Sequence, residues 1–501
     1  MDHDSVPLDL PGPSSHKIAD VRQAYVKITR RGLDVMGEKI AHDPAYRSNE
    51  SGHFAWDVSL LIRAACQTWR VTGEPHHLQQ AVSWAQHVME RTDEALGVVN
   101  WRGRSGPVWS AGPRYTAGTT TLGTIGGVPI HAQGAADSLL LERPSATTAR
   151  LHAKREGQTV WSLPEASLLP DEASYLPDFL ALRSSVHSVL IRGLPSPIDL
   201  TSLRAGEFPL EPQFAAHIVH TGMIARALIA AAEELESAER GTISAETTPD
   251  DLFSAAERAL LCHDDEIRTR SGQSWYITPE DFPGRRLGLE LPHNHVVDAA
   301  TSFLIIGRRK GNKGLRNLGA SLTRRFLREV EAYDSGVIRH PWYYYPVDSD
   351  IFFGVTRENP MVEREIRAVT RGEDSSHATM RVRALTEWKA IDDRLVSDEL
   401  LSSVALSFRR FFMANKNGVA TLKWLPEDDK RAPTLGRSNT FAGAGGSLAP
   451  WDSSIKRRIN SMAYRHPPTT IFGATVLSAA EIFALNAYPA TYASSGRTAP
   501  E

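Results

Sequence analysis

A unit of about 80 residues recurs along the chain and constrains its fold more than any other feature. Each copy has a polar turn, a mostly apolar helix, a short turn, an amphipathic helix and a Gly-containing extended piece that ends in aromatic residues. The period is longer than the roughly 20 to 50 residues of solenoid repeats, which favours paired helices arranged in a ring. The four copies begin near residues 53, 213, 293 and 374.

Apolar residues at helical spacing predict the individual helices. Their ranges are 17–38, 58–72, 77–92, 213–237, 250–270, 293–308, 312–333, 374–391, 397–414 and 469–485, with less regular patterns at 131–141 and 176–191. The Pro-rich region around 143–211 is interpreted as an insertion. We therefore predict an all-α fold with short β-hairpin and loop insertions. Residues 17–490 form one ring domain between an N-terminal arm (1–16) and a C-terminal tail (491–501).

Charge and composition narrow the classes of function. Lys plus Arg total 56 against 59 Asp plus Glu, a net charge of −3, so no overall basic field attracts nucleic acid. The first residues lack a signal-peptide pattern and no stretch approaches the ~20 apolar residues of a membrane span. Cys66 and Cys262 lie in apolar helical contexts, as expected for buried free thiols in a reducing compartment. These features predict a cytoplasmic protein without nucleic-acid or membrane partners.

Glu373 to His377 stand just ahead of a predicted apolar helix. Asp374 is predicted to cap that helix by accepting backbone N–H groups of Ser376 and His377. A functional interpretation adds His377 and Arg381, one turn apart on one face, where a guanidinium suits a substrate carboxylate. The capping and functional interpretations are compatible.

His293, Asn294 and His295 form a second polar cluster at a helix start. A neutral histidine can take a proton near pH 7 while the Asn294 amide stabilises a developing oxyanion. A metal at His293, His295 and His377 is an alternative, but no recognised ligand spacing such as His-Glu-x-x-His is present. We therefore predict no cofactor.

Aromatic and acidic residues supply the remaining candidates. Tyr343, Tyr344 and Tyr345 follow Trp342, where a tyrosine can stack on a sugar, donate a proton or simply pack. Asp57 shares a helix face with His53, next to Trp56. Paired with Glu373, Asp374 or Asp298, Asp57 fits the two-carboxylate chemistry of glycoside hydrolysis, or it serves only as a cap.

The near-repeating helix pairs resemble the (α/α)6 toroid, in which six inner helices are ringed by six outer ones. The His-Asn-His cluster, the face shared by His377 and Arg381, and the tyrosine run resemble toroidal polysaccharide lyases and the related uronyl epimerases. In such toroids the substrate groove lies where loops preceding the inner helices converge. In this sequence those loops also carry His131, His217, His220, Tyr464, Arg465 and His466.

The resemblance implies β-elimination from a uronate-containing glycan or oligosaccharide. The implied catalytic residues are Asn294, His295, Tyr344, His377 and Arg381, with Asp57 for the hydrolase alternative. The implied substrate-binding residues are His53, Trp56, Trp101, Arg114, His293, Tyr343, Tyr345, Glu373, Asp374, Trp424 and His466. Alternatives are a glycoside hydrolase of the same fold and a non-catalytic glycan-binding or scaffold protein. No glycan class finer than uronate-containing, and no oligomeric state, is predicted.

Overall fold

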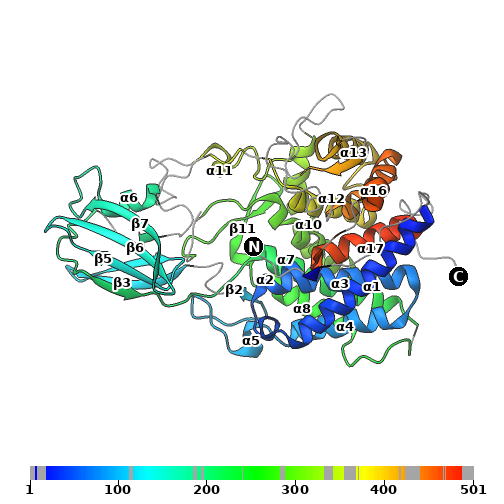
Figure 1. The fold of residues 1–501 in the computed structure, drawn as a ribbon, viewed down its shortest axis with the longest axis horizontal. Coiled ribbons are helices and arrows are strands. Elements are labelled where there is room, and N and C mark those ends of the chain that lie inside the picture. Colours follow the sequence, from blue (N-terminus) through cyan, green and yellow to red (C-terminus); the bar gives the residue numbers. More distant parts are fainter. Residues whose placement is uncertain are drawn as a thin grey trace.

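Most residues in strands lie between residues 118 and 209, and most helices lie before and after this region (Figure 1). The computed structural model describes residues 6–7, 18–111, 117–183, 189–192, 194, 197–239, 241–282, 288–331, 342–354, 368–370, 372–416, 419–423, 441–465, 468 and 470–487. Among these residues, none of the helices is both long and apolar enough to span a bilayer.

Six helices contact one another in a closed circuit, so that the last packs against the first. In circuit order they are α3 (Ser59–Thr72), α7 (Ile218–Ser237), α9 (Val297–Arg309), α12 (Ser375–Ile391), α15 (Ala442–Gly445) and α17 (Gly473–Ala487). We call these the ring helices. Six more helices pack on the ring helices from outside, several of them on two: α4 (Pro75–Met89) on α3 and α7, α8 (Pro249–Leu261) on α7 and α9, α10 (Lys313–Glu331) on α9, α13 (Asp398–Phe412) on α12, α16 (Ser453–Arg465) on α15 and α17, and α1 (Ile18–His42) on α17 and α3.

Small residues let the ring helices approach closely. A Cβ on Gly222 of α7 would lie 2.9 Å from the Ala299 backbone nitrogen of α9. A Cβ on Gly443 of α15 would overlap the Ser478 carbonyl oxygen of α17, and Gly443 N donates to Ser478 Oγ. Glycine is therefore required where these backbones meet, because any side chain would force them apart.

A second hydrophobic cluster, from Leu122 to Leu210, belongs to a β-rich part that lies to one side of the helices (Figure 1). Its antiparallel sheets have the strand orders β3-β4-β8 and β7-β6-β5-β9. The elements are β3 (Gly118–Ile125), β4 (Val128–Gly134), β5 (Ser138–Glu142), β6 (Thr148–Arg155), β7 (Gln158–Ser167), α6 (Leu176–Arg183), β8 (Leu190–Arg192) and β9 (Gly206–Pro209). The β3–β4 turn is Gly126-Gly127, both at positive φ, which suits a tight hairpin.

Shorter elements join the helices. Two hairpins follow α8 and α13: β11 (Ile267–Arg270) with β12 (Gln273–Tyr276), and β13 (Met413–Lys416) with β14 (Val419–Leu422). Two strand pairs link distant segments: β1 (Val6–Pro7) with β15 (Thr470–Ile471), and β2 (Ser110–Ala111) with β10 (Ala215–Ala216). Single turns of helix are η1 (Pro44–Arg47), α2 (Ser51–His53), α5 (Asp93–Leu96), η3 (Asp264–Glu266), α11 (Asp350–Phe353) and η5 (Gly446–Leu448).

The prediction of an all-α fold is wrong, because strands account for 17% of the structure. The predicted helix 131–141 is instead parts of β4 and β5, and the predicted helix 176–191 ends at Arg183 and is followed by β8. Leu139 and Leu141 are buried while Leu140 between them is only partly buried, a period of two that sheet pairing with β6 and β9 imposes. No helix is predicted between residues 414 and 469, yet this region contains the ring helix α15 and the outer helix α16.

Candidate functional site

Polar and aromatic residues from four elements meet at the N-terminal ends of the ring helices. The elements are the π-helical turn η2 (Phe54–Val58), the start of α7, the 3-10 turn η4 (His293–His295) and the start of α12. The π-turn holds Trp56, and such widened turns are frequent at functional sites. The segment 342–345 joins them, with Tyr343 bridged to Gly372 just before α12.

His377 is held in a fixed orientation by Asp374. Asp374 caps α12 as predicted, accepting the backbone N–H groups of Ser376 at 3.0 Å and His377 at 3.2 Å. Its second oxygen lies 2.8 Å from His377 Nδ1. Burial acts to raise the pKa of Asp374, but hydrogen bonds from His377 and Ser376 outweigh it and the pKa is lowered. Since the carboxylate only accepts, His377 Nδ1 carries the proton and Nε2 holds the lone pair of the neutral ring.

Aromatic rings surround His377, whose side chain is 24% exposed. Its ring centroid lies 5.6 Å from Tyr344 and 6.0 Å from Trp56. Tyr344 also lies 6.4 Å from the ring of His295. Three of the predicted catalytic residues, His295, Tyr344 and His377, are therefore together, and we call them with Trp56 and His220 the histidine–aromatic cluster.

His220 forms the buried side of this cluster. Its Nδ1 lies 2.8 Å from Ser51 Oγ, and its Nε2 accepts a hydrogen bond from Trp56 Nε1 at 3.2 Å. Burial, followed by the neighbouring His217 and His295, lowers the pKa of His220 well below its usual value. His220 is thus a neutral acceptor that fixes the indole of Trp56.

Asn294 is 1% exposed, and neither its amide nitrogen nor its oxygen hydrogen-bonds to any described residue. Buried amides normally have partners, so an unsatisfied one is a candidate binding group. His293, the residue before Asn294, turns toward α10, where its Nε2 lies 2.7 Å from Glu329 Oε2. His293 is therefore not brought together with His295 and His377 as a set of metal ligands.

The carboxylates considered for hydrolysis are occupied. Asp57 accepts a hydrogen bond from the Tyr46 hydroxyl at 3.0 Å and from Gly473 N at 3.3 Å. Glu373 Oε2 lies 2.6 Å from Arg381 Nε, and both side chains are fully buried. Burial raises the pKa of Glu373 to about 7, although Arg381 and His377 act to lower it.

Arg381 therefore has a task other than the one expected. Its guanidinium pairs with Glu373, donates to the Tyr343 carbonyl oxygen and lies 5.4 Å from the centre of the Phe326 ring. It holds the tyrosine segment against α12, and with no exposed surface it does not reach a substrate in this arrangement.

The other predicted binding residues are more scattered. The ring of His53 lies 5.4 Å from Tyr46, that of Tyr343 lies 5.1 Å from Phe352, and Tyr345 is buried with Leu289 and Ile351. Trp101 connects to the cluster indirectly, because Phe282 contacts both Trp101 and His217. Arg114, Trp424 and His466 lie outside the described residues.

A network of buried charges lies deeper in the ring and was not predicted. Glu387 of α12 accepts from Arg63 of α3 at 2.8 Å and from Arg226 of α7 at 2.7 Å. Arg63 also lies 3.5 Å from Asp298 of α9, and Arg383 of α12 pairs with Glu481 of α17. We call these six residues the axial ion network. Arg63, Arg226 and Arg383 each follow a site residue (Asp57, His220 and His377) by six positions, or about 9 Å along a helix.

One member of this network, Arg63, has a recognisable signal in the sequence. Arg63 interrupts an otherwise apolar run in α3, and a lone charge in such a run indicates a buried partner. No sequence pattern predicts a role for His263. Its Nε2 lies 2.9 Å from Thr221 Oγ1 and its Nδ1 lies 2.9 Å from Glu266. It lies on an outer connection, where no pattern distinguishes it from a surface histidine.

The partly buried His217 and the buried His220 predict acid sensitivity of the fold. Burial, with a smaller effect of His263, lowers the pKa of His217 to about 4. The histidine is protonated below about pH 6.5 in the unfolded chain, but only below about pH 4 in the folded protein. Between these two pH values the unfolded state therefore binds one more proton per such histidine. Stability is therefore present above about pH 6.5 and is lost as the pH falls toward 4. Replacing His217 with glutamine should reduce this slope by about 1.4 kcal/mol per pH unit, measured by urea unfolding at several pH values.

The matched control for this measurement is His131→Gln. His131 is exposed on β4, so its replacement should leave the slope unchanged. An equal slope in wild type and His217→Gln would show that His217 does not contribute to acid unfolding.

Three comparisons with known proteins are negative: no protein-family model, no curated protein and no solved structure matches the chain.

Proposed function

We propose that the protein is an enzyme that cleaves a uronate-containing glycan or oligosaccharide by β-elimination. The observation that carries this proposal is the placement of His377. Asp374 orients this imidazole, its side chain is partly exposed, and its ring contacts that of Tyr344. A base and a hydroxyl acid side by side are what the reaction requires.

The reaction transfers two protons and breaks one carbon–oxygen bond. His377 Nε2 removes the proton on the carbon next to the uronate carboxylate. The electron pair left behind forms a carbon–carbon double bond as the glycosidic oxygen on the next carbon departs. Tyr344 protonates that oxygen. The phenolate left on Tyr344 is reprotonated from solvent or from the imidazolium of His377.

Asn294 is assigned to the substrate carboxylate, which reaches this 1%-exposed amide only when η4 shifts on binding. Removing the proton becomes easier when the carboxylate charge is reduced by hydrogen bonding, and the buried Asn294 amide offers unsatisfied donors. His295 lies next to it in η4 and against Tyr344, where it helps to bind the same group. Trp56 and Tyr343 offer aromatic faces on which a sugar ring stacks.

The glycoside-hydrolase alternative is less well supported. It needs two carboxyl groups available to the glycosidic bond and to water. Asp57 is bound to Tyr46 and Gly473, Glu373 to Arg381, and Asp298 lies in the axial ion network. A non-catalytic scaffold would not require His295, Tyr344 and His377 to lie together in the histidine–aromatic cluster.

A screen of acidic and neutral oligosaccharides tests the proposal. Each reaction is followed by ultraviolet absorbance and by reducing ends. We expect acidic substrates to give both signals, because elimination creates a conjugated double bond. Reducing ends without new absorbance would identify a hydrolase, and neither signal with any acidic oligosaccharide would contradict the proposal.

We place this activity in the cytoplasm, on oligosaccharides already taken up. The two cysteines are free thiols, as expected in a reducing compartment, but only Cys66 is buried as predicted and Cys262 is exposed.

A further inference from the structure

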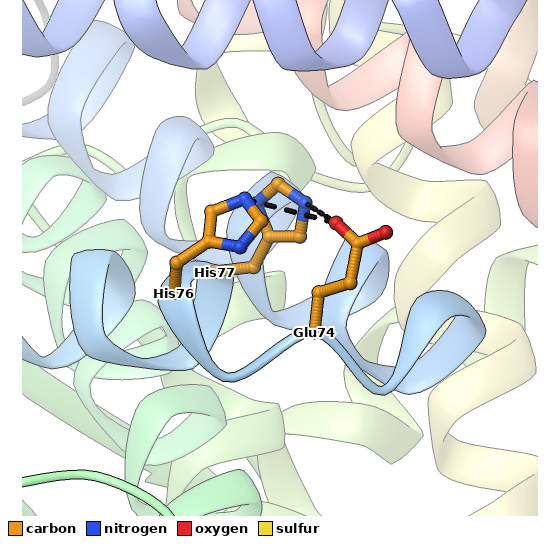
Figure 2. Close-up of side chains that lie close together, drawn as sticks. All are labelled: Glu74, His76 and His77. Carbon is orange, nitrogen blue, oxygen red and sulfur yellow. Dashed lines mark ion pairs between the residues drawn. The ribbon is translucent and has the colours of Figure 1, made fainter.

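We propose that Glu74, His76 and His77 bind a divalent transition-metal ion, with Zn²⁺ the best match. The three residues open helix α4, directly after the Gly73 turn that ends α3. Figure 2 shows both imidazoles and the carboxylate converging on one space. The π-turn that carries Trp56 precedes α3, whereas this site follows the other end of α3. It is therefore separate from the histidine–aromatic cluster.

The distances match those between ligands of one tetrahedral ion. Zn–N and Zn–O bonds of about 2.0–2.2 Å place neighbouring ligand atoms roughly 3.3–3.6 Å apart. Glu74 Oε2 lies 3.4 Å from His77 Nε2 and 3.8 Å from His76 Nε2. One ligand atom from each residue lies within 4.8 Å of the other two. Small side-chain rotations would therefore bring all three onto one ion.

His77 is the observation that points to a ligand. Its side chain is 2% exposed, and neither ring nitrogen makes a hydrogen bond to the described residues. A buried imidazole normally has a partner for at least one nitrogen, and a metal ion would supply it.

The surroundings leave Glu74 Oε2 free for the ion. Arg30 of α1 pairs with Oε1, the other carboxylate oxygen, and so orients the group. His76 is 63% exposed, which leaves the remaining coordination position open to water. Arg30 and the N–H groups at the start of α4 oppose a cation, and the Glu74 charge offsets part of this. Two imidazoles favour Zn²⁺ over Mg²⁺ and Ca²⁺, which prefer oxygen ligands.

Calorimetric titration of the chelator-treated, full-length protein with ZnCl₂ tests the site. We expect one tight equivalent in the wild type. His76→Ala, a change at an exposed position, should weaken that equivalent by at least about tenfold, as should Glu74→Gln. Titration with Co²⁺ should give visible absorption bands in the wild type that are lost in His76→Ala.

His42→Ala is the matched control. His42 is exposed on α1 and lies 3.3 Å from Glu38, and no third metal-binding side chain joins this His–Glu pair in the part of the chain that the structure describes. Its replacement should leave the tight equivalent unchanged. The proposal is overturned if the wild type shows no tight equivalent, or if His76→Ala binds Zn²⁺ as the wild type does.

Discussion

Replacing His377 with alanine is expected to reduce kcat on an acidic oligosaccharide by about 10²–10⁴-fold, the usual contribution of a positioned general base. The change removes the proposed proton acceptor but leaves the Asp374 cap and its backbone hydrogen bonds in place. The α12 helix should therefore persist, with a circular dichroism spectrum like that of the wild type. Initial rates of ultraviolet absorbance increase, measured across a range of substrate concentrations, provide kcat and KM.

Three further variants make this experiment specific. Tyr344→Phe keeps the ring that contacts His377 but removes the proposed acid, and should lower kcat by a similar factor. Asp374→Asn should lower kcat less and leave the free energy of unfolding almost unchanged, because asparagine caps a helix about as well as aspartate does. His131→Ala, in the β-rich part, should have full activity. Full activity of both His377→Ala and His295→Ala would refute the assignment of the site.

Replacing Glu387 with glutamine is expected to destabilise the fold by about 3 kcal/mol, the lower end of the range for breaking a buried ion pair, because Glu387 is 24% exposed. Burial alone would raise the pKa of Glu387, but Arg226 and Arg63 lower it, so the carboxylate is ionised at neutral pH. Glutamine keeps the shape and removes the charge. Among the described residues, Arg63 then keeps its ion pair with Asp298, at 3.5 Å, and Arg226 keeps its ion pair with Glu233, at 3.4 Å. Urea unfolding at pH 7.5 measures the loss.

The control for this prediction is Glu94→Gln. Glu94 pairs with Arg258 at 2.7 Å, and both side chains are well exposed. Surface pairs of this kind contribute about 0–1 kcal/mol, so the variant should unfold almost as the wild type does. Equal losses in Glu387→Gln and Glu94→Gln would show that the axial ion network does not stabilise the ring.

Local patterns in the sequence predicted the helices well where one face is apolar. The predicted range 374–391 corresponds to α12, and the Asp374 cap with its two backbone partners is confirmed. Helices 312–333 and 397–414 likewise match α10 and α13 to within a few residues. These features depend on side chains a few positions apart, which the sequence displays directly.

Features that depend on distant partners were not predictable in this way. Ala132, Ala135, Leu139 and Leu140 have helical spacing, yet pairing with β6, β8 and β9 makes this stretch two strands. The sequence placed Tyr344 and His377 at the same end of the ring but did not predict their contact. It did not predict the burial of Arg381 with Glu373. Nothing local distinguishes a buried arginine from one that faces a substrate.

Closure of the ring also sets the order in which the protein can fold during synthesis. The α17 helix packs on both α1 and α3, and the hydrogen bond between Gly473 and Asp57 joins residues 416 positions apart. At about 5–20 residues per second, the ribosome needs roughly 20–80 s to make the intervening chain. Throughout that time the apolar surfaces of α1 and α3 lack their partner. The nascent chain is therefore expected to depend on chaperones until α17 emerges and completes the ring.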